Sequence, residues 1–118
     1  MHKIMLLEDD PTMLSLLHTL LEIEGFKVSH TLDFGATLEA IRKEDPDLIL
    51  LDVNLREING LEVLESVRED TELKDVIIMM SSGMDLREEC MEKGANDFIL
   101  KPYMPDELVQ KIRNFLNE

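Results

Sequence analysis

The segment Leu48-Ile49-Leu50-Leu51-Asp52 places four consecutive apolar residues directly before a single carboxylate. A run this short and this apolar is typical of a strand covered on both faces, as in a parallel sheet. Four other segments have a similar length, although Phe26–His30 is less apolar and indicates a strand nearer the sheet edge. The five expected strands are Lys3–Leu7, Phe26–His30, Leu48–Leu51, Val76–Met80 and Asp97–Leu100.

Longer segments with a 3.6-residue apolar period lie between these runs. The first follows Pro11, which suits an initial helical turn, and Gly25 ends it. The expected helices cover residues 11–24, 34–44, 60–69, 84–93 and 105–117. Because strands and helices alternate along the chain, we expect an α/β fold in which a parallel sheet carries helices on both faces.

Composition limits the classes of function. A chain of 118 residues suits one domain with a single core, and its 44% apolar content is too high for a disordered acidic tail. Its net charge of −14 opposes binding to nucleic acid or anionic lipid, so we expect no direct contact with either. We expect no signal peptide and no membrane span, and the lone Cys90 cannot form an internal disulfide. These features favour a cytoplasmic domain.

Polar side chains directly follow four of the expected strands. They are Glu8, Asp9 and Asp10 after the first strand, Asp52 after the third, Ser81 and Ser82 after the fourth, and Lys101 after the fifth. In sheets of this kind ligands bind at the carboxyl ends of the strands, so we expect these side chains to share one rim. Converging carboxylates repel one another unless a cation is present, and a hard divalent ion such as Mg²⁺ would relieve that repulsion.

The same rim has the groups needed for phosphoryl transfer. A lysine and a hydroxyl can bind phosphoryl oxygens, and a carboxylate can act as the nucleophile that forms an acyl phosphate. Asp52 is the best candidate for that nucleophile because it stands alone at the end of the most apolar run. The carboxylates of Glu8-Asp9-Asp10 are then candidate metal ligands, and Lys101 and a hydroxyl of Ser81 or Ser82 are candidate phosphoryl contacts.

The chain resembles the receiver domains of two-component response regulators. Met5–Pro11 is similar to the family's acidic-pair motif, and Leu48–Leu55 followed by Asn59–Leu64 is similar to its phosphoacceptor strand and loop. Met79–Ser82 falls where the family has its switch Ser or Thr, and Gly94–Tyr103 resembles the fifth strand with its Lys-Pro pair. Four motifs in the right order cover essentially the whole chain.

This resemblance implies a flavodoxin-like (βα)5 fold, doubly wound, with a five-stranded parallel sheet in strand order 2-1-3-4-5. It implies that residues 1–118 form a single receiver domain. Such a domain accepts a phosphoryl group from a histidine kinase or a histidine phosphotransfer protein, and then controls a downstream effector protein or a fused output domain. It catalyses only its own phosphorylation and dephosphorylation. Whether the chain is a stand-alone regulator or part of a longer one is left open by the sequence.

The resemblance also implies roles for individual residues. Asp52 would be the phosphoacceptor. Asp9 would bind Mg²⁺ directly, Glu8 mostly through water, and Asn54 through its backbone carbonyl, with Asp52 completing the metal site; Mn²⁺ could substitute. Lys101 would pair first with the carboxylates and then with the phosphoryl group.

The implied switch involves two further residues. Ser81 would move to donate a hydrogen bond to the phosphoryl group, and Phe98 would rotate inward with it, which is how the family transmits its signal. The Lys101–Pro102 peptide bond would be cis.

The sequence departs from the family pattern in several places. Arg56 stands where Pro is usual, Asn59 where Asp is common, Ser82 in place of Ala, and Tyr103 in place of Phe. The segment from Ser81 to Gly94 is shorter than usual, which puts the fourth helix in doubt but leaves the chemistry untouched.

Structural interpretations compete with functional ones at several residues. Asp10 suits helix entry beside Pro11, and Cys90 suits a half-buried helix position without an activating neighbour. The three histidines share no spacing that favours a metal site. Phe98 is expected first of all as a core aromatic.

Three alternative functions compete with a role in a phosphorelay. A flavin-binding module would need a phosphate loop where this chain has Glu8-Asp9-Asp10, and a phosphatase would need an acid at Asn54. The remaining alternative is a degenerate receiver that acts as a phosphorylation-independent interaction module. Since every chemical group expected for phosphoryl transfer is present, the favoured hypothesis is a receiver that can be phosphorylated.

Overall fold

A computed structural model describes residues 1–118 and shows a single five-stranded parallel sheet in the order β2-β1-β3-β4-β5. The strands are β1 (Lys3–Leu7), β2 (Lys27–His30), β3 (Leu48–Asp52), β4 (Ile77–Ser82) and β5 (Asp97–Leu100). The expected flavodoxin-like fold and strand order are therefore confirmed. The least apolar strand, β2, lies at an edge as expected.

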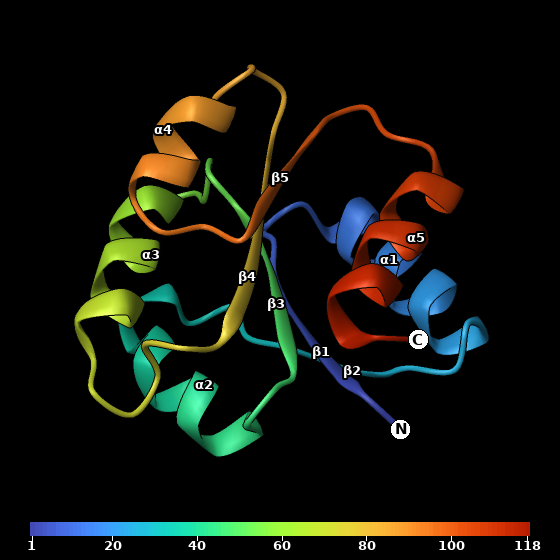
Figure 1. Ribbon diagram of the computed structural model, residues 1–118, viewed down its shortest axis with the longest axis horizontal. Coiled ribbons are helices and arrows are strands. Elements are labelled where there is room, and N and C mark those ends of the chain that lie inside the picture. The colour runs from blue at the N-terminus through green and yellow to red at the C-terminus, as the bar shows by residue number, and fades with distance from the viewer.

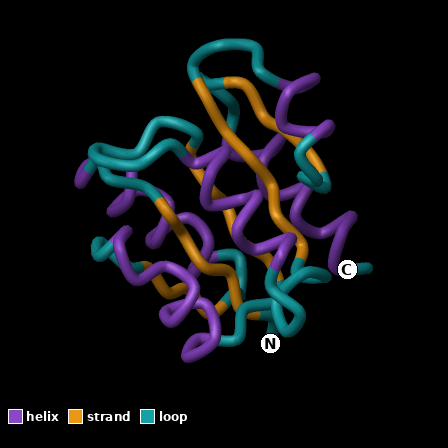
Figure 2. The backbone as a smooth tube through the Cα atoms, turned by 90° about the vertical axis from the view of Figure 1, so that its left-hand side faces the viewer, coloured by secondary structure: helices purple, strands orange, loops and turns teal.

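Five α-helices cover the two faces of this sheet. They are α1 (Pro11–Ile23), α2 (Thr37–Glu44), α3 (Gly60–Glu69), α4 (Arg87–Glu92) and α5 (Pro105–Leu116). Figure 1 shows α1 and α5 on one side of the sheet and α2, α3 and α4 on the other. Figure 2 looks onto the sheet from the side that carries α2, α3 and α4.

The sheet separates two apolar cores. In β1, Ile4 and Leu6 pack toward α1 and α5, whereas Met5 and Leu7 pack toward α2, α3 and α4. All five residues of β3 are buried, which explains why this central strand has no polar position before Asp52. Removing this apolar surface from water on both faces is the main force that holds the layers together.

Two helices are shorter than the sequence predicts. The segment expected to be helical from residue 34 begins with a 3-10 turn, Phe34–Ala36, and α2 starts only at Thr37. The segment expected over 84–93 is helical only from Arg87 to Glu92, so the doubt about the fourth helix was justified. Cys90 in this helix is fully buried, which corrects the expectation of half-burial.

Arg68 joins two connecting segments on the α3 side of the molecule. Its guanidinium donates hydrogen bonds to the carbonyls of Gly94, Lys74 and Val76 and to the Oδ1 atom of Asn96, all at 2.7–2.9 Å. The end of α3 is thereby tied to the segments that precede β4 and β5. These bonds hold the starts of β4, which carries Ser81, and of β5, which leads to Lys101.

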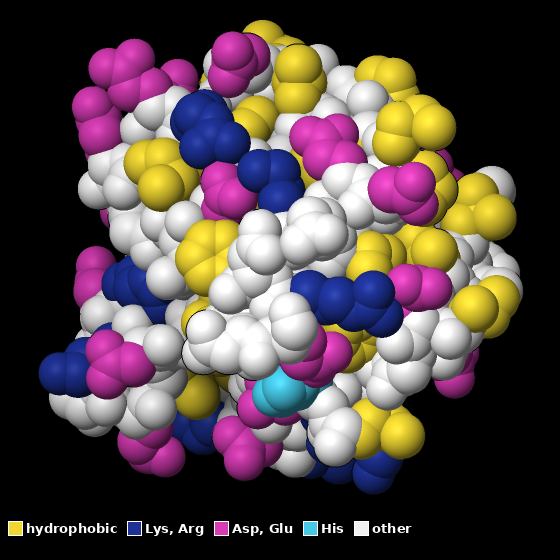
Figure 3. Space-filling view, turned by 45° about the vertical axis from the view of Figure 1, so that its right-hand side comes forward, with side chains coloured by type: hydrophobic (Ala, Val, Ile, Leu, Met, Phe, Trp, Pro, Cys, Tyr) yellow, Lys and Arg dark blue, Asp and Glu magenta, His cyan; other side chains and the backbone are white.

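Charged and apolar side chains alternate on the exposed surface. Figure 3 shows the side that carries α1 and α5, where basic side chains are separated by acidic and apolar ones. No helix combines the length and the apolar character that crossing a bilayer requires.

Candidate functional site

The carboxyl ends of four strands meet at one rim of the sheet. Glu8 directly follows β1, Asp52 is the last residue of β3, Ser81 lies near the end of β4, and Lys101 directly follows β5. Asp52 and Ser81 are partners in the parallel register of β3 and β4. The fold therefore brings together four of the side chains that the sequence singled out, although 93 residues separate Glu8 from Lys101.

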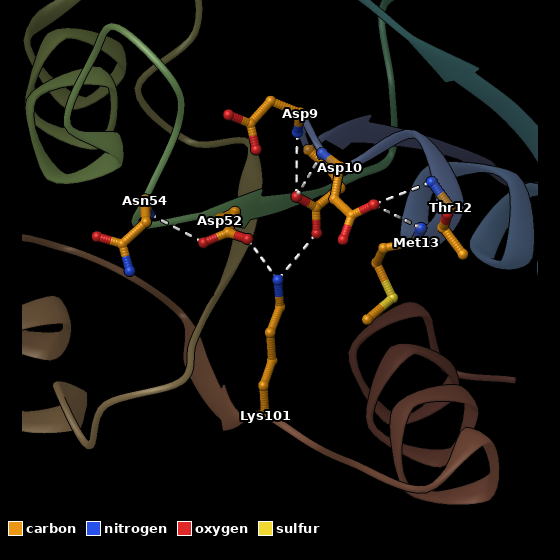
Figure 4. A network of polar contacts seen from close by, with 8 residues as sticks. Asp9, Asp10, Thr12, Met13, Asp52, Asn54 and Lys101 are labelled. Carbon is orange, nitrogen blue, oxygen red and sulfur yellow. Dashed lines mark hydrogen bonds and ion pairs between the residues drawn. The ribbon is translucent and has the colours of Figure 1, made fainter.

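The Lys101 ammonium group lies between two buried carboxylates. Its Nζ atom is 2.9 Å from the Oε1 atom of Glu8 and also donates to the Oδ2 atom of Asp52 (Figure 4). Glu8 is only 5% exposed and Asp52 6%, so neither carboxylate is solvated as it would be on the surface. One ammonium group thus stabilises two buried carboxylates.

Burial and pairing act against each other in this cluster. Burial raises the pKa of Glu8, the Asp52 charge raises it further, and the Lys101 bond only partly offsets these effects. Burial alone would lower the pKa of Lys101, but hydrogen bonds to Asp52 and Glu8 outweigh it and raise that pKa. Lys101 is therefore firmly protonated, and burial favours the protonated form of Glu8.

Backbone amides hold the remaining carboxylate oxygens. The Oε2 atom of Glu8 accepts hydrogen bonds from the amides of Asp9 and Asp10, at 3.0 and 3.3 Å. The Oδ1 atom of Asp52 accepts one from the amide of Asn54 at 2.9 Å. These contacts fix both carboxylates in orientation, which a reacting group requires.

Asp10 has the structural role expected for it. Its Oδ1 atom accepts hydrogen bonds from the amides of Thr12 and Met13, at 2.9 and 3.4 Å, and so caps α1 (Figure 4). Pro11 occupies the first turn, where its missing amide hydrogen is not needed.

Asp9 stands apart from the Lys101 cluster. Figure 4 shows its carboxylate turned away from the Lys101 ammonium group, and its Oδ2 atom lies 4.0 Å from the Nε atom of Arg56. No three acidic, His or Cys side chains surround one point in a way that could hold a metal ion. The expected convergence of three carboxylates is therefore seen for Glu8 and Asp52 only, because Lys101 binds both of these carboxylates while the Asp9 carboxylate lies toward Arg56.

The chemistry of the donor set nevertheless suits Mg²⁺. Glu8, Asp9 and Asp52 supply carboxylate oxygens at one rim, and Asn54 supplies a backbone carbonyl two residues after Asp52. Hard oxygen ligands of this kind, completed by water and a phosphate oxygen, are what Mg²⁺ prefers. Direct ligation by Asp9 requires its carboxylate to turn toward the other two.

The loop after β3 keeps a defined shape despite Arg56 and Asn59. Asn54 and Asn59 form an isolated antiparallel bridge, and the Oδ1 atom of Asn59 caps α3 by accepting from the amide of Leu61 at 2.9 Å. At Gly60 a Cβ atom would lie 2.9 Å from the Val53 Cα atom, so only glycine allows this close approach. Asn59 thus performs the capping that Asp would perform.

The two serines of β4 have different surroundings. Ser81 is buried at the rim, beside Asp52. Ser82 is fully buried, and its Oγ atom accepts a hydrogen bond from the amide of Met84 at 3.1 Å. Only Ser81 is placed to approach a group on Asp52.

Phe98 is buried in the core on the α4 side of the sheet. Its carbonyl oxygen accepts a hydrogen bond from Arg87 of α4 at 2.9 Å, and Arg87 also lies 3.1 Å from the Asp97 carboxylate. The aromatic ring therefore occupies the inward position in this structure. The expectation of a core aromatic is confirmed, whereas its rotation stays a prediction.

Sequence reasoning missed one polar group near the rim. The Lys101–Pro102 peptide is cis, as expected, and Tyr103 follows it. The Tyr103 hydroxyl is buried without a hydrogen-bond partner, and burial is the main cause that raises the pKa of Tyr103 to about 12. The replacement of the usual Phe by Tyr at this position was the signal that could have revealed it.

Comparison with known proteins identifies the family. The model of the response regulator receiver domain matches residues 4–113. The chain belongs to this family. It is 39% identical over 117 residues to the transcriptional regulatory protein CpxR of Escherichia coli, covering 98% of this chain and 50% of CpxR. It is 34% identical to the DNA-binding response regulator MtrA of Mycolicibacterium smegmatis, covering 94% of this chain and 49% of MtrA. This receiver domain thus spans about half the length of these curated relatives.

Solved receiver structures share the fold of this domain. A response regulator structure from Chloroflexus aurantiacus has a TM-score of 0.90 at 31% identity, covering 99% of this chain and 98% of that one. The BeF3-activated receiver domain of Klebsiella pneumoniae RstA has a TM-score of 0.89 at 28% identity, covering 98% and 99%. The receiver domain thus belongs to a response regulator, consistent with two-component signalling.

Proposed function

We propose that this receiver domain accepts a phosphoryl group on Asp52 from a phosphohistidine of a histidine kinase or a histidine phosphotransfer protein. The observation that carries the proposal is the position of the Asp52 carboxylate, which ends the central strand and is held by Lys101 beside Glu8. In the transfer, the bond between phosphorus and the imidazole nitrogen breaks and its electron pair stays on the imidazole. A new bond forms from a carboxylate oxygen of Asp52 to phosphorus.

The residues around Asp52 would perform the remaining tasks. The amide of Asn54 holds Oδ1, so the carboxylate keeps one orientation toward the incoming donor. The Lys101 ammonium group offsets the charge that builds up on the phosphoryl oxygens. Catalysis of this reaction requires mainly such positioning and charge neutralisation, and the domain would act only on its own phosphorylation state.

Glu8, Asp9, Asp52 and the backbone carbonyl of Asn54 would hold Mg²⁺, for which Mn²⁺ could substitute. When bound, the metal supplies neutralisation of the negative charge shared by the carboxylates and the phosphoryl oxygens. The Asp9 carboxylate can turn toward the metal at little cost, because its contact with Arg56, at 4.0 Å, is the only one that it would lose.

Phosphorylation would change the surface that partners recognise. It replaces a carboxylate by a group of about −1.5 to −2 charge. Ser81, the register partner of Asp52, would donate a hydrogen bond to this group, and Phe98 lies in the core next to α4. A shift of β4 and β5 would then favour binding of a downstream effector or a fused output domain.

The cellular setting follows from the same assignment. Residues 1–118 would act as one receiver domain in the cytoplasm, with no membrane contact and no nucleic acid contact of their own. The relatives MtrA and CpxR are described as DNA-binding and transcriptional regulators, so a DNA-binding output domain is the partner we favour.

The decisive experiment is incubation of the protein with Mg²⁺ and acetyl phosphate, followed by intact mass spectrometry. We expect a Mg²⁺-dependent gain of one phosphoryl group in the wild type and none in Asp52→Asn, in which the amide cannot act as the nucleophile. No gain with acetyl phosphate or with a phosphorylated histidine kinase would favour a phosphorylation-independent interaction module.

A further inference from the structure

The hydroxyl of Tyr103 is a buried donor without an acceptor. Tyr103 lies between β5 and α5, two residues after Lys101, and its ring packs against the core on the α1 and α5 side. Its hydroxyl oxygen is closed off from solvent and has no hydrogen-bond partner. Buried polar atoms of proteins are nearly always hydrogen-bonded, so this exception calls for a physical reason.

The surroundings of this residue are polar on one side only. A narrow space beneath the rim is lined by Tyr103 together with Glu8, Asp52 and Ser81, and otherwise by leucines. The space is too tight to admit a water molecule, so water cannot satisfy the hydroxyl. Phenylalanine would fill the same position without an unbonded polar atom.

The two carboxylates that line this space are engaged by Lys101. The Oε1 atom of Glu8 and the Oδ2 atom of Asp52 both bind the Lys101 ammonium group. If Lys101 moves toward a phosphoryl group on Asp52, the Oε1 atom of Glu8 loses its only side-chain donor. Glu8 then remains as a buried charge held by two backbone amides alone.

We propose that Tyr103 is a positioning residue whose hydroxyl donates a hydrogen bond to Glu8 when Lys101 turns to the phosphorylated Asp52. This inference rests on the proposed function. Glu8 is the favoured acceptor because a hydrogen bond to an ionised group is stronger than one to a neutral group, and the Asp52 carboxylate is consumed in the acyl phosphate. The unbonded hydroxyl makes the unphosphorylated state less favourable, and its bond to Glu8 stabilises the phosphorylated state.

The composition of the chain gives this idea a direct spectroscopic test. Tyr103 is the only tyrosine and there is no tryptophan, so the tyrosine fluorescence of the protein reports on Tyr103 alone. Phenol fluorescence falls when the hydroxyl donates to a carboxylate. We expect the emission to fall when wild-type protein is given Mg²⁺ and acetyl phosphate, and to stay constant with Mg²⁺ alone or in Asp52→Asn.

Intact mass measured on the same samples separates the two hypotheses. A phosphoryl gain without a change in emission overturns the role of Tyr103 and leaves the proposed function standing. Absence of a phosphoryl gain in the wild type, with acetyl phosphate and with a phosphorylated histidine kinase alike, overturns the proposed function itself. If phosphorylated Glu8→Gln shows the same fall in emission as the wild type, the acceptor is not Glu8 and the inference is wrong.

The variant Tyr103→Phe provides a second test that does not depend on fluorescence. Without phosphodonor, its melting temperature should equal or exceed that of the wild type, because the unbonded hydroxyl is gone. The rise in melting temperature on activation by beryllofluoride and Mg²⁺ should be smaller than in the wild type by several degrees. If Tyr103 has only a structural role, Tyr103→Phe should lower the melting temperature by the same amount with and without beryllofluoride. That result would overturn the proposal.

Discussion

Replacement of Lys101 by methionine tests whether one ammonium group stabilises two buried carboxylates. Methionine keeps most of the aliphatic chain, so the variant removes the charge with little loss of packing. Lys101 has 21% side-chain exposure, whereas the Glu8 and Asp52 side chains have 6% and 7%. The change therefore leaves two nearly buried, like charges at the rim without their cation.

The expected loss can be estimated from buried ion pairs. Removing one partner of such a pair typically costs about 3–5 kcal/mol. The rim is open to solvent at Lys101, and Glu8 can take up a proton because its pKa is raised, first of all by burial. We therefore expect a loss at or below the lower end of this range, about 2–3 kcal/mol, which corresponds to a fall in melting temperature of roughly 10 °C for a domain of this size.

The pH dependence has a definite sign. Because the pKa of Lys101 is raised, its contribution is fully present below its ordinary value of 10.5 and is lost only as the pH rises through the higher, folded value. Neutral pH lies within this window. In Lys101→Met the deficit should shrink as the pH falls below neutrality, because burial raises the pKa of Glu8 and the folded protein therefore protonates it more readily than the unfolded chain does.

Urea unfolding in Mg²⁺-free buffer is the appropriate assay, and the chain offers a matched control. Lys111 also pairs with a carboxylate, that of Asp97, at 3.0 Å, but this pair is more exposed. We expect Lys111→Met to lose at most about 1 kcal/mol. Equal losses in Lys101→Met and Lys111→Met at neutral pH would refute the view that Lys101 compensates buried charge.

Two further predictions concern Gly60, which lies against the backbone of Asp52, and the contact between His18 of α1 and His30 of β2. Gly60→Ala should reduce the unfolding free energy by roughly 2–3 kcal/mol in urea denaturation, since its Cβ atom would meet the backbone of Asp52 and Val53. Burial, followed by the charge of His18, lowers the pKa of His30, so the folded protein resists its protonation. The unfolding free energy should therefore fall as the pH drops through the ordinary histidine value of 6.5, less steeply in His30→Gln; equal slopes in the two proteins would contradict this reasoning.

Much of the fold could be predicted because buried parallel strands have a simple sequence pattern. The run Leu48–Leu51 had to be covered on both faces, and the polar residues after such runs had to meet at one rim. Helix boundaries were less certain: α2 and α4 start late because residues 34–36 form a 3-10 turn and residues 84–86 precede any helical turn. Such local geometry depends on contacts that the apolar period does not reveal.

The side-chain arrangement at the rim was harder to predict than its composition. Sequence reasoning placed Glu8, Asp52 and Lys101 together, and the structure does so. It also expected Asp9 to join them, but pairing within the first three leaves Asp9 facing Arg56. The position of a carboxylate depends on which cation is nearest, and residue types along a chain do not specify that distance.

The charge balance of the rim connects Lys101, the proposed metal site and Tyr103. Three carboxylates and one ammonium group, from Glu8, Asp9, Asp52 and Lys101, leave two negative charges, which one divalent cation neutralises. Phosphorylation of Asp52 then adds charge at one point, and the single ammonium group cannot remain equally close to Glu8 and to the phosphoryl oxygens. Glu8 must either gain a proton, for which its raised pKa prepares it, or gain a new donor. The neutral hydroxyl of Tyr103, which lines the same space as Glu8, provides that donor and leaves the charge balance unchanged. A second lysine at this place would add a positive charge.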